Sequence, residues 1–100
     1  MPKLYEYLGI IIFFYSNEHE PVHVHGRYGE FESKAEIIFE NGFVKSIRIL
    51  DVEGKKPLPT SQKKDFKKLV ITLSDEIVQS WINYFVYNKK IITKKIAGKL

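Results

Sequence analysis

The hydrophobic pattern of this chain changes its period once, and that change constrains the fold more than any other feature of the sequence. In the first half, apolar residues recur at every second position, most clearly from Phe31 to Phe39, where they alternate with charged side chains. Such alternation predicts half-buried strands. From Thr60 onwards the apolar positions follow a helical period, which predicts helices with one dry face. Strands followed by helices predict an α+β fold, with an antiparallel sheet of three to five strands packed on one or two C-terminal helices.

A chain of 100 residues has room for one domain, so we expect residues 1–100 to fold as a single unit. Its parts are a strand-rich segment (1–54), a helical segment (60–88) and a basic tail (89–100) that can form an edge strand or a short helix. We expect strands over 5–15, 22–25, 31–39 and 43–50, the first of them continuous and buried on both faces.

The connection between the strands 31–39 and 43–50 is predicted from their hydrophobic faces. A two-residue loop at Asn41-Gly42 would place Glu36 opposite Ile47 and so mix charge with core. A three-residue loop with Gly42 left-handed in a bulge keeps the apolar faces together, and we predict that loop. The helical segment can be one kinked helix or two packed helices, and the side chains expected to cover the sheet are Phe66, Leu69, Leu73, Trp81 and Phe85.

The absence of cysteine excludes a disulfide framework, a thiolate metal site and a cysteine nucleophile. The longest apolar run, 8–15, is far shorter than the roughly 20 residues of a membrane span. We therefore expect a cytoplasmic protein with no membrane contact, and the sequence predicts no cofactor.

The charge of the chain is divided unevenly along its length. Residues 1–54 carry five basic and nine acidic side chains, whereas residues 55–100 carry eleven basic and three acidic ones. At helical spacing, one arc away from the apolar stripe collects Lys63, Lys64, Lys67 and Lys68. A clustered positive field attracts polyanions, so we interpret these lysines as a binding face for an acidic partner protein or a nucleic-acid backbone. The alternative is a solvated helix face that serves solubility alone.

All three histidines lie within seven residues, in the segment 19–25. Pro21 excludes a helix there, and the alternation from Val22 to His25 predicts a strand with His23 and His25 on one face, about 6–7 Å apart. If Tyr28-Gly29 forms the following turn, His25 lies opposite Glu32.

Three interpretations of this cluster remain open. The histidines can be partly exposed residues that satisfy backbone or carboxylate groups. His23, His25 and Glu32 can form a metal site. His19, His23 and His25, assisted by Arg27, can contact phosphate or perform general acid–base catalysis near neutral pH.

The segment His19–His25 follows the pattern H-x-P-x-H-x-H, which is fairly specific. Together with the segments 1–2, 7–12, 27–32, 75–77 and 81–85, it makes most of the chain resemble the small bacterial family called domain of unknown function 4160. The chain departs from that pattern at Val22, where a second proline is common, and in its longer lysine-rich tail. The family motif falls on His19, Pro21, His23, His25, Arg27, Tyr28 and Gly29.

The resemblance implies a compact cytoplasmic domain without an assigned activity, often encoded beside another small uncharacterised protein. Such pairing is similar to a toxin–antitoxin arrangement, and it gives no catalytic role to any residue.

Two functions are therefore expected from the sequence. The first is a non-enzymatic module that binds an acidic protein or nucleic acid through its lysines and resembles a toxin–antitoxin component. The second is a histidine-dependent nuclease or other phosphate-handling enzyme, with or without a metal. Homo-oligomerisation is compatible with both.

Overall fold

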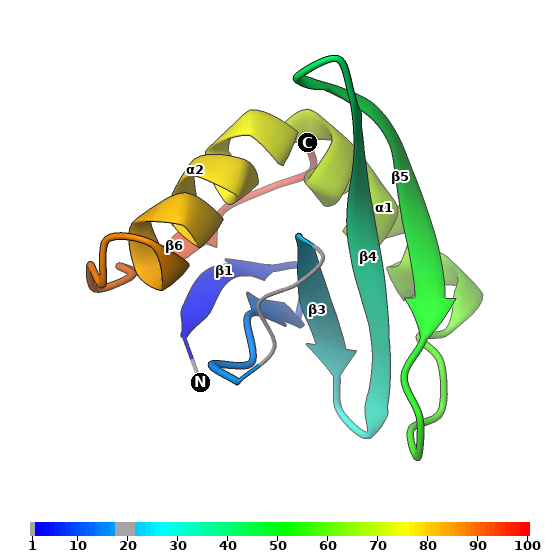
Figure 1. The fold of residues 1–100 in the computed structure, drawn as a ribbon. Coiled ribbons are helices and arrows are strands. Elements are labelled where there is room, and N and C mark those ends of the chain that lie inside the picture. Colours follow the sequence, from blue (N-terminus) through cyan, green and yellow to red (C-terminus); the bar gives the residue numbers. More distant parts are fainter. Residues whose placement is uncertain (1, 18–21) are drawn as a thin grey trace.

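The computed structural model describes residues 2–17 and 22–100, which form a six-stranded mixed sheet covered by two helices (Figure 1). The strand order is β5-β4-β3-β2-β1-β6. The elements in chain order are β1 (Lys3–Tyr7), β2 (Ile10–Phe13), β3 (His23–Tyr28), β4 (Phe31–Glu40), β5 (Phe43–Asp51), α1 (Thr60–Thr72), α2 (Ser74–Phe85) and β6 (Lys94–Ile96). The α+β class is confirmed, and the helical segment consists of two helices. Neither of the helices that the structure describes is long and apolar enough to cross a membrane.

The expectation of an antiparallel sheet with three to five strands was wrong for two reasons. The segment 5–15 is a hairpin and not one strand, because Leu8 and Gly9 both adopt positive φ (48° and 80°) and reverse the chain. The tail forms the edge strand that was one of its two expected structures, but this strand, β6, pairs with β1 in parallel, which makes the sheet mixed. α2 brings the chain to the β1 edge of the sheet, and β6 follows there (Figure 1).

The β4–β5 hairpin keeps its apolar faces together, as predicted, but does so through a different loop. Its loop has two residues, Asn41 and Gly42, with φ of 54° and 83°, so the predicted three-residue loop was wrong. The register shifts further along, between Ile38 and Phe39, where β5 carries one extra residue. Beyond that bulge Glu36 lies opposite Arg48, with Oε1 and Nη2 3.6 Å apart.

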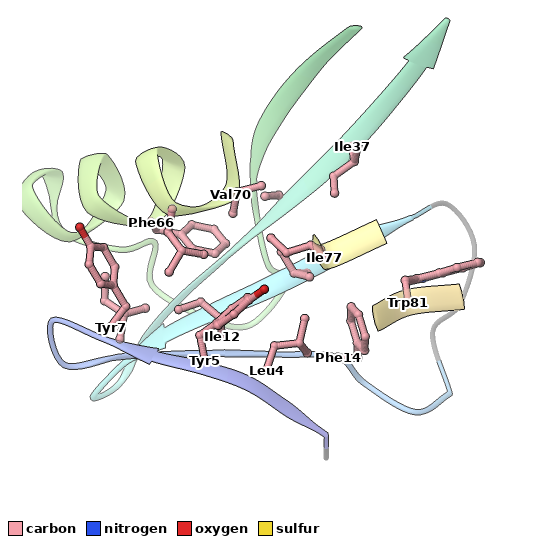
Figure 2. Packing of buried hydrophobic residues seen from close by; sticks show 14 of the residues in the cluster. Leu4, Tyr5, Tyr7, Ile12, Phe14, Ile37, Phe66, Val70, Ile77 and Trp81 are labelled. Atoms are coloured by element: carbon pink, nitrogen blue, oxygen red, sulfur yellow. The ribbon is translucent and has the colours of Figure 1, made fainter. Parts of the chain in front are cut away.

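The helices and the sheet enclose the hydrophobic core between them (Figure 2). Of the residues expected to cover the sheet, Phe66, Leu69 and Trp81 are buried, and Leu73 and Phe85 are partly buried against the core. In Figure 2, the helical residues lie against Leu4, Tyr5 and Tyr7 of β1, Ile12 of β2, and Phe14, which follows β2.

Gly26 in β3 permits the close approach of α1 to the middle of the sheet. A Cβ at this position would lie 2.7 Å from Cδ1 and 2.8 Å from Cε1 of the Phe66 ring. Contacts of that length do not occur without displacement of one partner, and Phe66 is fully buried. The glycine is therefore required by helix packing.

Glu76, in the first turn of α2, joins both strands at one edge of the sheet. Its Oε1 accepts hydrogen bonds from the hydroxyl of Tyr5 in β1 (2.8 Å) and from Nζ of Lys94 in β6 (2.9 Å). The bond from Lys94 and then that from Tyr5 lower the pKa of Glu76. Burial, followed by the hydrogen bond to Glu76, raises the pKa of Tyr5 well above its usual value. This carboxylate attaches β6 to the domain.

We expect Gly26→Ala to lower the free energy of unfolding by about 1–3 kcal/mol, because the added methyl group overpacks the core against Phe66. Urea denaturation followed by tryptophan fluorescence measures the loss. The double variant Gly26→Ala, Phe66→Leu should lose less than the sum of the two single losses. Ser46→Ala on an exposed strand position is the control. Strictly additive losses would contradict the contact.

The stabilising effect of Glu76 should depend on pH. Since its folded-state pKa is lowered, the carboxylate stabilises the fold above its unfolded-state pKa, and this contribution is lost as pH falls through the folded-state pKa. We expect Glu76→Gln to lose less than about 1 kcal/mol near neutral pH, because both charged partners are substantially exposed. In urea denaturation at several pH values, the difference from the parent should disappear in acid. Glu53→Gln, at an exposed position, is the control, and a difference independent of pH would contradict the assignment.

Candidate functional site

The face of the sheet opposite the helices carries a buried polar cluster at its centre. Strand alternation places Val24 and Gly26 of β3 toward the helices and His23, His25 and Arg27 toward this second face. Phe13 of β2 lies opposite His25, and it is fully buried without belonging to the core under the helices. The second face therefore has a buried centre of its own.

Glu32 is the shared hydrogen-bond acceptor of this cluster. Its Oε2 accepts a bond from the hydroxyl of Tyr15 (3.1 Å) and lies 3.1 Å from Nδ1 of His25. Both Glu32 and His25 are 1% exposed. We call Tyr15, His23, His25 and Glu32 the histidine–glutamate cluster.

Aromatic contacts fix the imidazole of His25 in place. Phe13 stacks on it with ring centroids 5.4 Å apart, and Tyr15 meets it edge-on at 4.5 Å. The ring of His23 lies 5.3 Å from that of His25. The orientation of His25 is thus set from three sides.

The hydrogen bond to Glu32 determines what His25 can do chemically. When Glu32 is ionised it only accepts, so Nδ1 of His25 then carries the proton and, in the neutral ring, the lone pair lies on Nε2. The pair has the arrangement that orients a general base or a metal ligand.

The structure confirms that His23 and His25 share one face of a strand near Glu32, but it corrects the register. Glu32 pairs with Arg27, and His25 pairs with Lys34, because the loop is Gly29-Glu30 and not Tyr28-Gly29. His25 reaches Glu32 diagonally across the two strands. The expectation that these histidines are partly exposed was wrong, since His23 is 6% and His25 1% exposed. The expectation that they satisfy a carboxylate is confirmed for His25, which contacts Glu32.

The other predicted members of the site have different placements. His19 lies outside the described residues. Arg27 is partly buried, with its guanidinium carbon 5.3 Å from the centroid of the Phe13 ring, and it forms no ion pair with a described residue. Tyr15 was missed by the sequence analysis, although its two-residue spacing from Phe13 could have placed it on this face.

No group of three or more histidine, aspartate or glutamate side chains within 2–17 and 22–100 is arranged to hold a metal ion. Glu32 and Nδ1 of His25 are bonded to each other, so they do not both present lone pairs to a common ion. Metal binding through His23 and His25 stays a prediction.

The predicted lysines form one surface on α1, which we call the α1 lysine face: Lys63, Lys64, Lys67 and Lys68. Three of them are exposed and Lys63 is partly buried. None of the four forms an ion pair with a described residue, whereas Lys45, Lys56, Lys94 and Lys95 each lie within 4 Å of a carboxylate.

We expect Glu32→Ala to lower the free energy of unfolding by about 2–4 kcal/mol, because the buried His25 and the partly buried Tyr15 lose their common acceptor. Glu36→Ala is the matched control, since Glu36 lies on the same face of the same strand in a partly exposed ion pair. Its loss should stay below about 1 kcal/mol. Urea denaturation measures both, and equal losses would show that the cluster contributes no special stability.

Comparison with known proteins places the chain in a family. No curated protein and no solved structure matches it. The family model described as a domain of unknown function, DUF4160, matches residues 9–82. The matched segment starts in the β1–β2 turn and ends in α2, so it contains the described members of the histidine–glutamate cluster and the α1 lysine face. Because the match covers well over half of its length, the chain belongs to the DUF4160 family.

Proposed function

We propose that this protein is a non-enzymatic interaction module that binds a polyanionic surface through the α1 lysine face. The observation that carries the proposal is the difference between two sets of lysines. Lys45, Lys56, Lys94 and Lys95 each have a carboxylate within 4 Å, whereas the four lysines that stand together on α1 have no such partner among the described residues.

The arrangement has an energetic cost within the domain. Lys63 and Lys67, and likewise Lys64 and Lys68, stand four residues apart on one helix, where like charges repel each other by a few tenths of a kcal/mol. An external polyanion removes this repulsion and gains the attraction of all four charges. Binding then offsets the repulsion within the helix.

The chemistry of the face favours attraction to charge over base recognition. It presents ammonium groups, without an arginine to form paired hydrogen bonds and without an aromatic ring for stacking on bases. The partner is accordingly an acidic protein or a nucleic-acid backbone. An acidic protein encoded with this chain, as in a toxin–antitoxin pair, satisfies the same requirement.

A second candidate function is a histidine-dependent phosphate-handling enzyme. The observation that favours it is the hydrogen bond between His25 and Glu32, with the cationic Arg27 two residues along the same face. His25 would act as the general base and Arg27 would stabilise developing charge on a phosphoryl group. Both side chains are buried, so an enzyme of this kind would have to expose His25 before it could reach a substrate.

We expect binding of polyglutamate and of an RNA hairpin to weaken as salt increases, with a slope set by the number of lysines engaged. Replacing Lys63, Lys64, Lys67 and Lys68 with glutamine should reduce the magnitude of the log–log slope for RNA by about 3, at roughly 0.7–0.9 for each lysine that neutralises a phosphate. Fluorescence anisotropy at several salt concentrations measures it.

The control variant replaces Lys45, Lys56, Lys94 and Lys95 with glutamine, so that net charge changes equally while the α1 lysine face stays intact. If both variants changed the salt dependence of binding equally, the α1 lysine face would act only through its contribution to net charge. Cleavage of the RNA probe by the parent and by the α1 variant, but not by His25→Gln, would instead support the enzyme.

A further inference from the structure

We propose that the α1 lysine face continues into an apolar groove, and that together they bind an acidic segment of a partner protein that carries apolar anchor residues. The inference rests on the proposed function and names its partner as protein rather than nucleic acid. The groove lies between β5 and the junction of the two helices and has a volume of about 510 Å³. Its walls include Phe43, Val44 and Ile47 of β5 and Ile71, Ser74 and Asp75 of the helices.

Ile71 links the groove to the lysines. It lies three residues after Lys68, four after Lys67 and seven after Lys64, so it stands on the same face of α1 as these three. A helix face that served solubility alone would be expected to carry a polar residue at this position. Ile71 is 51% exposed and lines the groove, which places an apolar contact beside the positive charge.

The opposite wall supplies a second exposed apolar side chain. Phe43, at the start of β5, is 77% exposed. The end of the β4–β5 hairpin that carries it extends past the shorter strands (Figure 1). A side chain inserted between Phe43 and Ile71 would cover both, and buried apolar anchors of this kind dominate the affinity of many protein interfaces.

The sheet edge at the groove fits a polypeptide. β5 has β4 as its single neighbour in the described sheet, so the outer backbone groups of its nine residues face away from any paired strand. An extended peptide can pair with both the N–H and the C=O groups along such an edge, whereas the phosphates of a nucleic-acid backbone only accept hydrogen bonds and leave the carbonyl groups unpaired. Lysines, apolar walls and strand edge together select an acidic protein segment.

Asp75 gives the groove a direction. It lines the end formed by the start of α2, so a partner carboxylate is repelled there. Lys45 also lines the groove but is paired with Glu40 at 2.8 Å, which leaves the lysines of α1 as the stronger attraction. The partner segment should therefore carry its acidic residues on the α1 side of its apolar anchors.

The test uses a short glutamate-rich peptide with a central pair of leucines, the same peptide with both leucines replaced by glutamine, and a single-stranded DNA of similar charge. We expect the leucine peptide to bind the full chain at least about tenfold more tightly than the other two probes, as measured by fluorescence anisotropy, which corresponds to about 1.4 kcal/mol. Ile71→Ser and Phe43→Ser should each remove most of that preference while the salt dependence stays unchanged. Asp75→Asn should tighten binding of the leucine peptide.

Ile92→Ser is the matched control, since Ile92 is 85% exposed and lies away from the groove lining. The inference is overturned if the two peptides bind equally, if Ile71→Ser and Phe43→Ser leave the preference intact, or if DNA binds most tightly. The proposed function fails separately, when replacement of the four α1 lysines leaves the binding of every probe and its salt dependence unchanged.

Discussion

The contact between Gly26 and Phe66 is the constraint on which the arrangement of the molecule depends. It allows α1 to lie against the third strand at a distance that any other residue at position 26 would increase. Strand alternation then directs the flanking side chains, His25 and Arg27, to the opposite face. One short strand thereby fixes the position of the helices, the composition of the histidine–glutamate cluster and, through the orientation of α1, the direction in which the lysines point.

The two candidate sites lie on opposite sides of the sheet. The histidine–glutamate cluster is buried on the helix-free face, whereas the α1 lysine face is on the outer side of the helix that covers the other face. Because the sheet and the hydrophobic core separate them, substitutions at one should affect the other only through overall stability. A protein of this design can use a rigid, buried polar centre to hold its sheet in shape while its interactions take place elsewhere.

The sequence predicts the α+β class, the alternation of side chains between the two faces of β3 and β4, and the burial of Phe66 and Trp81 in the core. It failed where a turn had no polar marker: Leu8 adopts the left-handed conformation inside an apolar run, which hid the first hairpin. It also failed where a turn lies one residue further along the chain than expected, because that displacement changes every pair of the ladder. The two-residue turn at Gly29-Glu30 is the example. For the site, period two placed His23 and His25 together, but their burial and the role of Tyr15 depend on packing that local patterns do not encode.

The two edges of the sheet differ in length and charge, and this asymmetry limits how the protein can assemble. On one side β6 has three residues, two of them lysines, and such a short charged edge discourages another strand from pairing. On the other side β5 offers nine residues. A sheet with one open edge can accept one further strand, from a partner or from a second copy related by a twofold axis, and growth then stops. β5 is therefore the edge of the described sheet that is better suited to pairing with a further strand.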